Sequence, residues 1–147
     1  MYSLNPIGII HTPINSLENA PIQSARSSLH GSADIYPAYQ EGLEGIDQFS
    51  HIYLLYFFDR SESTFAMKVK PFLDDKEHGL FTTRFPCRPN PIGFSVVKVI
   101  SVVENRINFL GADMLDGTPL LDIKPYIPEF DVFIADKVGW YKTRQFD

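Results

Sequence analysis

The chain has 147 residues, of which 44% are hydrophobic and 21% are charged, and these values exclude a disordered chain and a coiled coil. This length suits one ordinary domain with a single core that buries roughly two-thirds of the surface of the unfolded chain. The net charge of −5 disfavours a protein that binds nucleic acid over its whole surface, so any contact with nucleic acid requires a local basic patch.

Eleven prolines and few long helical periodicities favour an all-β or β-rich fold. Residues 3–12 predict a short strand, which Pro6 places at the edge of a sheet and Pro13 ends. His11, at the end of this strand, is more often a hydrogen-bonded structural residue than a catalyst. Residues 15–31 show neither strand nor helix periodicity and predict a long loop, and such loops in small domains are usually functional or mobile.

Residues 33–39 contain strand-forming side chains, and residues 40–45 end in a Gly-x-x-Gly turn. Residues 49–58 (FSHIYLLYFF) are almost continuously apolar, which predicts a strand that is covered on both faces at the centre of the sheet. His51 in this strand is expected to be a hydrogen-bonded core residue. Asp59 and Arg60 follow where the strand reaches solvent, which is a usual place for a site on a rigid element, although an adjacent acid and base can also be merely solvated.

Residues 61–79 form a linker of mixed charge. Lys68 and Lys70 share a face if this segment is extended, which makes them candidates for contact with phosphate. Alternatively, the two lysines form ion pairs within the protein or are simply solvated.

Residues 82–93 (TTRFPCRPNPIG) form a stiff loop that cannot be a helix, because each proline fixes its own φ and holds the residue before it extended. Gly93 permits a positive φ or a close approach by another group. Arg84 and Arg88 offer planar guanidinium groups to carboxylate or phosphate, unless they pair with nearby aspartates. A rise of about 3.1 Å per residue separates the two arginines by roughly 12 Å, so they need different partners.

Residues 94–103 and 107–110 predict a β-hairpin. Residues 111–126 then contain three aspartates and the turn signal Asp116-Gly117. Their spacing lacks the alternating oxygen ligands of a calcium loop, and histidine is missing from the segment, so no metal site is predicted. Asp122 and Lys124 alternate with Leu121 and Ile123, a pattern that is typical of the solvent face and the covered face of one strand.

Three motifs, at residues 42–61, 83–93 and 115–128, occur in the same order as in the TsaA-like family, which includes the TrmO-type tRNA methyltransferases. The chain resembles this family over most of its length. The resemblance implies a single β-barrel domain over residues 1–147, with six or more strands, few short helices and long loops, and without the additional C-terminal domain of longer members. It also implies methylation of N6 of threonylcarbamoyl-adenosine next to the anticodon of threonine tRNA, with S-adenosylmethionine as donor and a homodimer that binds the donor near its interface.

The resemblance also assigns individual residues. Contacts to the methyl donor are implied for Pro21, Ile22, Gln23, Asp59, Arg60, Arg84, Phe94, Gly111, Ala112, Asp113, Met114, Asp116, Gly117, Thr118 and Pro119. Ile22 replaces an arginine of the family pattern, so only backbone or apolar contact is implied there. Contacts to the substrate are assigned to Arg88, Asn90, Lys68, Lys70 and Lys124, and the candidate proton acceptors are Asp59, Asp113 and Tyr126.

Several common signatures are missing from the sequence. A glycine-rich dinucleotide motif, a phosphate-loop lysine and a nucleophilic serine or cysteine motif do not occur, which argues against a Rossmann-type methyltransferase. The single cysteine, Cys87, and the lack of a leader-like or membrane-spanning stretch predict a cytoplasmic protein without a membrane partner. Two other functions remain open: a non-catalytic protein that binds S-adenosylmethionine or an adenine nucleotide, and a methyltransferase for a small molecule.

Overall fold

The computed structural model describes residues 1–16 and 27–141. The chain divides into two compact units, and each is described by itself. The barrel unit comprises Met1–Asp59 and Ile92–Ile127, and the loop unit comprises Arg60–Pro91 and Pro128–Asp147. The single domain expected over residues 1–147 stays a prediction.

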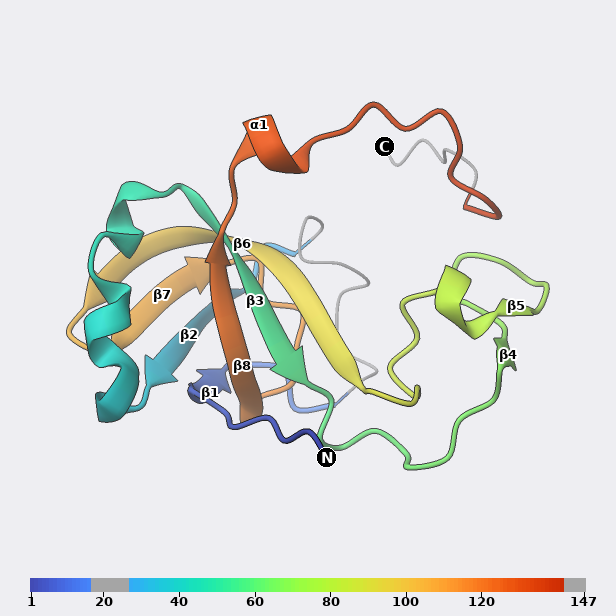
Figure 1. The fold of residues 1–147 in the computed structure, drawn as a ribbon, viewed down its shortest axis with the longest axis horizontal. Coiled ribbons are helices and arrows are strands. Elements are labelled where there is room, and N and C mark those ends of the chain that lie inside the picture. The colour runs from blue at the N-terminus through green and yellow to red at the C-terminus, as the bar shows by residue number, and fades with distance from the viewer. Residues whose placement is uncertain (17–26, 142–147) are drawn as a thin grey trace. The chain divides into compact units, whose positions relative to one another are not determined.

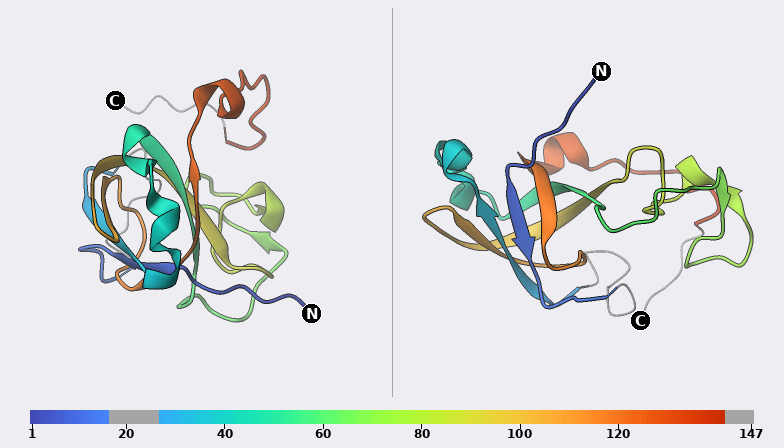
Figure 2. Two further views of the ribbon diagram at one scale, coloured as in Figure 1. Left: turned by 60° about the vertical axis from the view of Figure 1, so that its left-hand side comes forward. Right: turned by 90° about the horizontal axis from the view of Figure 1, so that it is seen from below.

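Six strands form a closed antiparallel barrel, which confirms the predicted fold class (Figure 1). The strands are β1 (Gly8–His11), β2 (His30–Ile35), β3 (His51–Phe57), β6 (Ile92–Val103), β7 (Arg106–Leu110) and β8 (Thr118–Pro125). Their order around the barrel is β1-β2-β7-β6-β3-β8, and β8 closes the barrel by pairing with β1. Two 3-10 helices, η3 (Pro37–Leu43) and η4 (Ile46–Gln48), connect β2 to β3 and lie over one end of the barrel, where they are drawn in cyan (Figure 2).

β1 is not an edge strand, contrary to the expectation from Pro6. It pairs with β2 on one side and with β8 on the other. Pro6 precedes the strand, so its missing N–H group removes no bond from either ladder. The strand expected at residues 33–39 begins and ends earlier, at His30–Ile35, because Pro37 starts the helix η3.

β3 alternates between the inside and the outside of the barrel. Ile52, Leu54 and Tyr56 are buried inside, whereas the residues between them are partly exposed on the outer face. The expectation of a strand covered on both faces at the centre of a sheet was therefore wrong, since a closed barrel has no central strand. His51 is also not a core residue: its ring lies on the outer face, where Nδ1 is 2.9 Å from the hydroxyl oxygen of Ser50.

The core fills the barrel with inward side chains from all six strands. Its largest fully buried member is Phe109, and it also contains Ile10, Ala33, Ile35, Leu43, Ile52, Leu54, Tyr56, Val97, Ile107, Ala112, Met114 and Leu120. β6 and β7 form the predicted hairpin, in which Val103 pairs with Arg106. Glu104 in the two-residue turn has a φ of 55°, which suits the twist of a tight hairpin.

β8 contains an irregularity that the sequence pattern did not predict. Leu55 pairs with Asp122, but the next residue, Tyr56, pairs with Leu120, so that Leu121 is an extra residue in the ladder. As a result, Leu120 and Ile123 both pack toward the core, and the expectation that Leu121 and Ile123 share the covered face of the strand was wrong.

The loop unit holds little regular structure. β4 (Lys68–Val69) pairs with β5 (His78–Gly79), η5 (Leu80–Thr82) follows, and α1 (Pro128–Asp131) is one short helix. The Nε1–H group of Trp140 donates to the carbonyl oxygen of Thr82 at 2.8 Å, and its ring stacks on His78 with 5.2 Å between centroids. In the two described stretches of the chain, helices are all too short or too polar to span a lipid bilayer.

Candidate functional site

Residues 111–117, which connect β7 to β8, are held firmly at one end of the barrel. The backbone N–H groups of Gly111 and Ala112 both donate to the carbonyl oxygen of Leu29, at 2.9 and 3.0 Å. The hydroxyl group of Ser27 donates to the carbonyl oxygen of Ala112 at 2.6 Å. Gly111 has a φ of 108°, a conformation that a residue with a side chain rarely adopts, which explains the glycine at the start of this segment.

The end of β1 holds the other half of this segment. The hydroxyl group of Thr12 donates to the carbonyl oxygen of Met114 at 2.8 Å, and the Thr12 N–H group donates to Oδ1 of Asp116 at 3.1 Å. In return, the N–H groups of Asp116 and Gly117 donate to backbone oxygens of Ile14 and Ile10, both at 2.8 Å. The segment is therefore fixed from both sides, by β1 and by residues 27–29.

His11 connects two carboxylates at this end of the barrel. Its Nε2 atom is 3.3 Å from Oδ2 of Asp34, and its Nδ1 atom is 3.4 Å from Oδ1 of Asp116. The Arg106 guanidinium donates to both carboxylate oxygens of Asp34, at 2.7 and 3.1 Å, and this bond is the main reason why the pKa of Asp34 lies below its ordinary value. Partial burial opposes the shift and His11 adds to it. His11 thus contacts two aspartates, and the expectation that it is a structural residue stays a prediction.

A chain of hydrogen bonds leads from the interior of the barrel to Asp113. The hydroxyl group of Ser95 donates to Oδ1 of Asp113 at 2.6 Å, and the hydroxyl oxygens of Tyr56 and Ser95 are 2.8 Å apart. Tyr56 and Ser95 are buried, whereas Asp113 is partly exposed. Sequence reasoning did not identify Ser95 or Tyr56. The alternation along β6 places Ser95 with Gly93 and Val97 on the inner face, and a serine at such a position was a signal that could have been noticed.

The predicted site residues fall into three groups. Asp59, Phe94, residues 111–119, Lys124 and Tyr126 belong to the barrel unit, and Arg60, Lys68, Lys70, Arg84, Arg88 and Asn90 belong to the loop unit. Pro21, Ile22 and Gln23 lie outside the described residues.

Within the barrel unit, the candidate proton acceptors do not lie together. The N–H group of Tyr126 donates to the carbonyl oxygen of His51 at the first residue of β3, whereas Asp59 follows the last residue. At about 3.3 Å per residue the two positions are roughly 25 Å apart, so one reacting nitrogen cannot contact both. Phe94 is exposed on the outer face of β6, whereas Ser95, which donates to Asp113, lies on the inner face. Lys124 is exposed and is 3.1 Å from Oδ2 of Asp122.

In the loop unit, Arg88 stabilises the proline-rich loop itself. Its Nη1 group donates to the carbonyl oxygens of Thr83 and Phe85, at 3.0 and 2.8 Å, and its guanidinium carbon is 6.0 Å from the centre of the Phe81 ring. The loop expected at residues 82–93 is shorter in the structure, because Thr82 ends the 3-10 helix η5 and β6 begins at Ile92; residues 83–91 between them contain no helix. Lys68, Lys70 and Arg84 are exposed.

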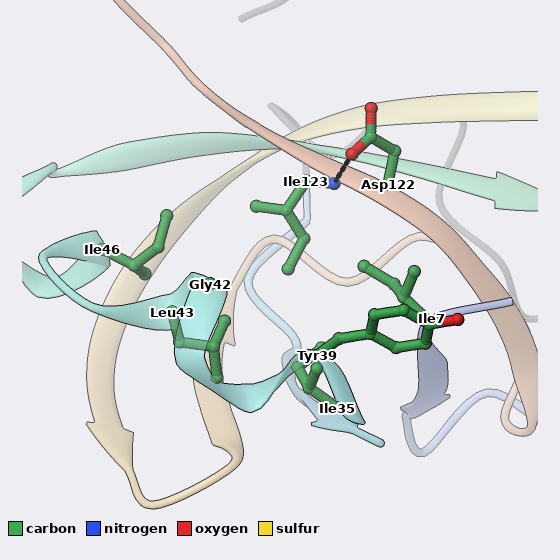
Figure 3. A pocket seen from close by; sticks show the side chains of 8 residues that line it. All are labelled: Ile7, Ile35, Tyr39, Gly42, Leu43, Ile46, Asp122 and Ile123. Carbon is green, nitrogen blue, oxygen red and sulfur yellow. Dashed lines mark hydrogen bonds between the residues drawn. The ribbon is translucent and has the colours of Figure 1, made fainter. Parts of the chain in front are cut away.

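A pocket of about 370 Å³ lies at the other end of the barrel unit, between η3, η4 and the strands (Figure 3). It is lined by Ile7, Ile35, Tyr39, Gly42, Leu43, Ile46, Asp122 and Ile123. Ile7 precedes β1, whereas Thr12 follows it, so this pocket and the segment 111–117 lie at opposite ends of β1. In Figure 3 the carboxylate of Asp122 turns away from the apolar side chains and accepts from the N–H group of Ile123, so the lining is mostly apolar.

The described residues contain no group of three or more histidine, cysteine, aspartate or glutamate side chains that is placed to hold a metal ion. The polar groups at the barrel end are engaged with one another instead. The groups that this end of the barrel offers to a ligand are therefore the partly exposed carboxylate of Asp113, the two carboxylates beside His11 and ordered backbone groups.

Three comparisons place this geometry among known proteins. A family model described as the tRNA-methyltransferase O N-terminal domain matches residues 9–132. A relative from Pyrococcus abyssi named "Probable S-adenosyl-L-methionine-binding protein" is 46% identical, over 95% of this chain and 76% of the relative. A mouse protein named "tRNA (adenine(37)-N6)-methyltransferase" is 35% identical, over 86% of this chain and 31% of the relative.

The fold has solved counterparts as well. The crystal structure of TrmO from Pseudomonas aeruginosa matches with a TM-score of 0.80 and 33% identity, over 97% of this chain and 63% of the other. This chain therefore spans less than two thirds of that protein and about a third of the mouse relative.

Proposed function

Because the chain belongs to the tRNA-methyltransferase O family, we propose that it transfers a methyl group from S-adenosylmethionine to a tRNA. The observation that carries this proposal is the segment 111–117, which is held from two sides and which the family resemblance assigns to the methyl donor. The names of two relatives support it, since one is named for binding S-adenosylmethionine and the other for methylating a tRNA adenine. The proposed target is N6 of threonylcarbamoyl-adenosine beside the anticodon of a threonine tRNA, and the proposed location of the protein is the cytoplasm.

The residues of the segment 111–117 fit such a donor in their chemistry. Gly111 and Gly117, with φ values of 108° and 82°, turn the backbone at each end, and the hydrogen bonds to β1 and to residues 27–29 hold the residues between them in one conformation for a ligand. Asp113 supplies a carboxylate that can accept from a ribose hydroxyl or an ammonium group. When bound, S-adenosylmethionine supplies an electrophilic methyl group on a sulfonium.

The contribution of this chain to the transfer is mainly placement. Holding two reactants in line for a displacement is worth on the order of 7–11 kcal/mol. Of the proton acceptors named from the sequence, Asp113 lies within the ordered segment and accepts from Ser95 at 2.6 Å, so it is the one whose orientation the barrel controls. Tyr126, at the opposite end of β3 from Asp59, contacts the rings of His51 and Tyr53 on the outer face.

Titration calorimetry tests the donor. We expect heat of binding for S-adenosylmethionine at a protein concentration near 0.1 mM, where dissociation constants of about that size still register. S-adenosylhomocysteine serves as the comparison ligand. A flat titration with both compounds would overturn the proposed donor.

Mass spectrometry of nucleosides tests the substrate. Threonine tRNA incubated with the protein and S-adenosylmethionine should yield methylated threonylcarbamoyl-adenosine, and Asp113→Asn should reduce the yield. The second candidate function is a non-catalytic S-adenosylmethionine-binding protein, which the name of the Pyrococcus relative favours. Binding of the donor without any methylated nucleoside or small-molecule product would support that alternative.

Two arginines of the proline-rich loop should separate donor binding from stability. The resemblance assigns Arg84 to the donor, where a charged hydrogen bond contributes roughly 1.5–3 kcal/mol, so Arg84→Ala should weaken donor binding about ten- to a hundredfold. Arg88 donates to two carbonyl oxygens of its own loop, so Arg88→Ala should mainly lower the melting temperature. Normal donor binding by Arg84→Ala together with early unfolding would reverse the two assignments.

We also propose that the chain forms a homodimer with the donor near the interface, as the resemblance implies. Sedimentation equilibrium should then give about twice the chain mass of 16.7 kDa. A species of 16.7 kDa alone, at all concentrations and with the donor present, contradicts the dimer.

A further inference from the structure

Tyr56, Ser95 and Asp113 form a hydrogen-bonded chain with a defined direction. An ionised carboxylate can only accept, so Ser95 donates its one hydroxyl hydrogen to Asp113 over 2.6 Å. The hydroxyl oxygen of Ser95 must then accept from Tyr56, whose oxygen is 2.8 Å away. The chain therefore runs from Tyr56 through Ser95 to Asp113, and each hydrogen bond polarises the next one toward the carboxylate.

The two hydroxyl groups of this chain are buried among apolar side chains inside the barrel. Tyr56 and Ser95 are 4% and 2% exposed, and Leu54 and Val97 lie on the same inner faces of β3 and β6. Burial of hydroxyl groups is unfavourable unless they are hydrogen-bonded, and an apolar pair would fill this place at no such cost. Packing alone therefore does not account for the two hydroxyl groups.

Gly93 makes room for the ring of Tyr56. A Cβ atom on Gly93 would lie 2.5 Å from Cε2 of Tyr56 and 2.6 Å from Cζ of Phe58, far inside van der Waals contact. Tyr56 and Phe58 in turn pack edge to face, with 5.5 Å between ring centroids. The glycine that ends the proline-rich motif is thus required for a close approach, and the ring that approaches it carries the first hydroxyl group of the chain.

We propose that Tyr56 and Ser95 are positioning residues that hold the carboxylate of Asp113 in one orientation for its contact with the methyl donor. This inference rests on the proposed function, because it takes the segment 111–117 as the donor site. Asp113 itself touches the ligand, whereas the two hydroxyl groups act only through it. Their purpose is to help keep a partly exposed carboxylate in its binding geometry before the donor arrives.

The decisive variant is the double substitution Tyr56→Phe with Ser95→Ala. Ser95→Ala alone removes the bond between the buried Tyr56 hydroxyl group and Ser95, and Tyr56→Phe alone leaves Ser95 still donating to Asp113. The double change removes both hydroxyl groups together and is expected to leave the fold nearly as stable as before. We expect the double variant to melt within a few degrees of the wild type and to bind S-adenosylmethionine about tenfold more weakly. Ser101→Ala is the matched control, because Ser101 is also a hydrogen-bonded serine of β6 but lies beside Asn108, away from Asp113.

Coupling to Asp113 separates positioning from a general structural effect. In an Asp113→Ala background, which removes the side-chain oxygen that accepts from Ser95, the double substitution should change donor affinity no further. A double variant that binds the donor as tightly as the wild type, or an equal loss of affinity in both backgrounds, would overturn the inference.

A measurement without the donor keeps the inference independent of the proposed function. Three-bond NMR couplings of Asp113 should report a single side-chain rotamer in the wild type and averaging in the double variant. If the wild type binds no S-adenosylmethionine, the proposed function fails, but unchanged couplings in the double variant would still refute the positioning role.

Discussion

Gly8 lies so close to the neighbouring strand that the barrel has no room for a side chain there. In β1 it lies opposite Ile35 of β2 and Leu120 of β8, at the point where the barrel closes. A Cβ atom at this residue would lie 2.3 Å from the carbonyl oxygen of Asp34 and 3.0 Å from Cα of Ile35. Both neighbours are backbone atoms, so no rotation of a side chain can relieve the contact.

The substitution Gly8→Ala therefore forces β1 away from β2. Ordinary contact between carbon and oxygen needs roughly 3.3 Å, so the strand must move by about 1 Å. Overpacking costs about 1–3 kcal/mol, and each weakened backbone hydrogen bond at this closure adds about 0.5–1.5 kcal/mol. We expect a loss of about 2–4 kcal/mol in the free energy of unfolding, which corresponds to a melting temperature lower by roughly 6–15 °C for a chain of this size.

Thermal unfolding followed by circular dichroism measures this effect, with Gly42→Ala as the matched control. A Cβ atom on Gly42 meets nothing within 4 Å, so the same substitution there should be neutral or slightly stabilising, because it reduces the entropy of the unfolded chain. Equal melting temperatures for the two variants would refute the reasoning, since β1 would then not pack against the carbonyl group of Asp34.

Three further predictions follow from named contacts. Arg106→Gln should lower the melting temperature at pH 7, because it removes the ion pair with Asp34. The difference from wild type should shrink as the pH falls from about 4 toward 2, because the pKa of Asp34 is lowered by this pair and the stabilisation is lost when the carboxylate is protonated. A difference in melting temperature that persists at pH 2 contradicts this prediction. Phe109→Ala, at the largest fully buried side chain, should cost about 3–5 kcal/mol in urea unfolding, whereas Val103→Ala on the exposed surface should cost about 0.5 kcal/mol or less. His78→Ala should change the fluorescence of Trp140, the single tryptophan, because its ring loses the imidazole stacked at 5.2 Å; an unchanged spectrum would argue against the stack.

Local patterns predicted the strands well and their partners poorly. The apolar run before Asp59, the hairpin of β6 and β7 and the stiff proline-rich loop all follow from residues that are close in sequence. Strand neighbours depend on closure of the barrel, and no local pattern reports that. This is why β1 was expected at an edge and β3 at a centre, when the barrel has neither.

The candidate site shows the same limit at the level of side chains. The segment 111–117 was identified from its motif, but the groups that hold it come from residues about a hundred positions earlier, such as Thr12. The extra residue at Leu121 exchanges the inward and outward positions of β8 on either side of it. A sequence pattern that assumes strictly alternating inward and outward side chains cannot reveal such an inserted residue. Ser95 was detectable as a polar residue on an inner face, but its partners Tyr56 and Asp113 became evident only from the closed barrel.

The pairing of β1 with β8 has a consequence for synthesis on the ribosome. Gly8 is made more than a hundred residues before its partner Leu120. At about 5–20 residues per second, β1 has to wait roughly 5–20 s before the strand that closes the barrel exists. During that interval the apolar side chains of Ile10 and Ile35 have no complete core to join. The nascent chain thus exposes apolar surface until β8 is made. A chaperone that binds near the ribosomal exit tunnel would protect the chain most during this interval.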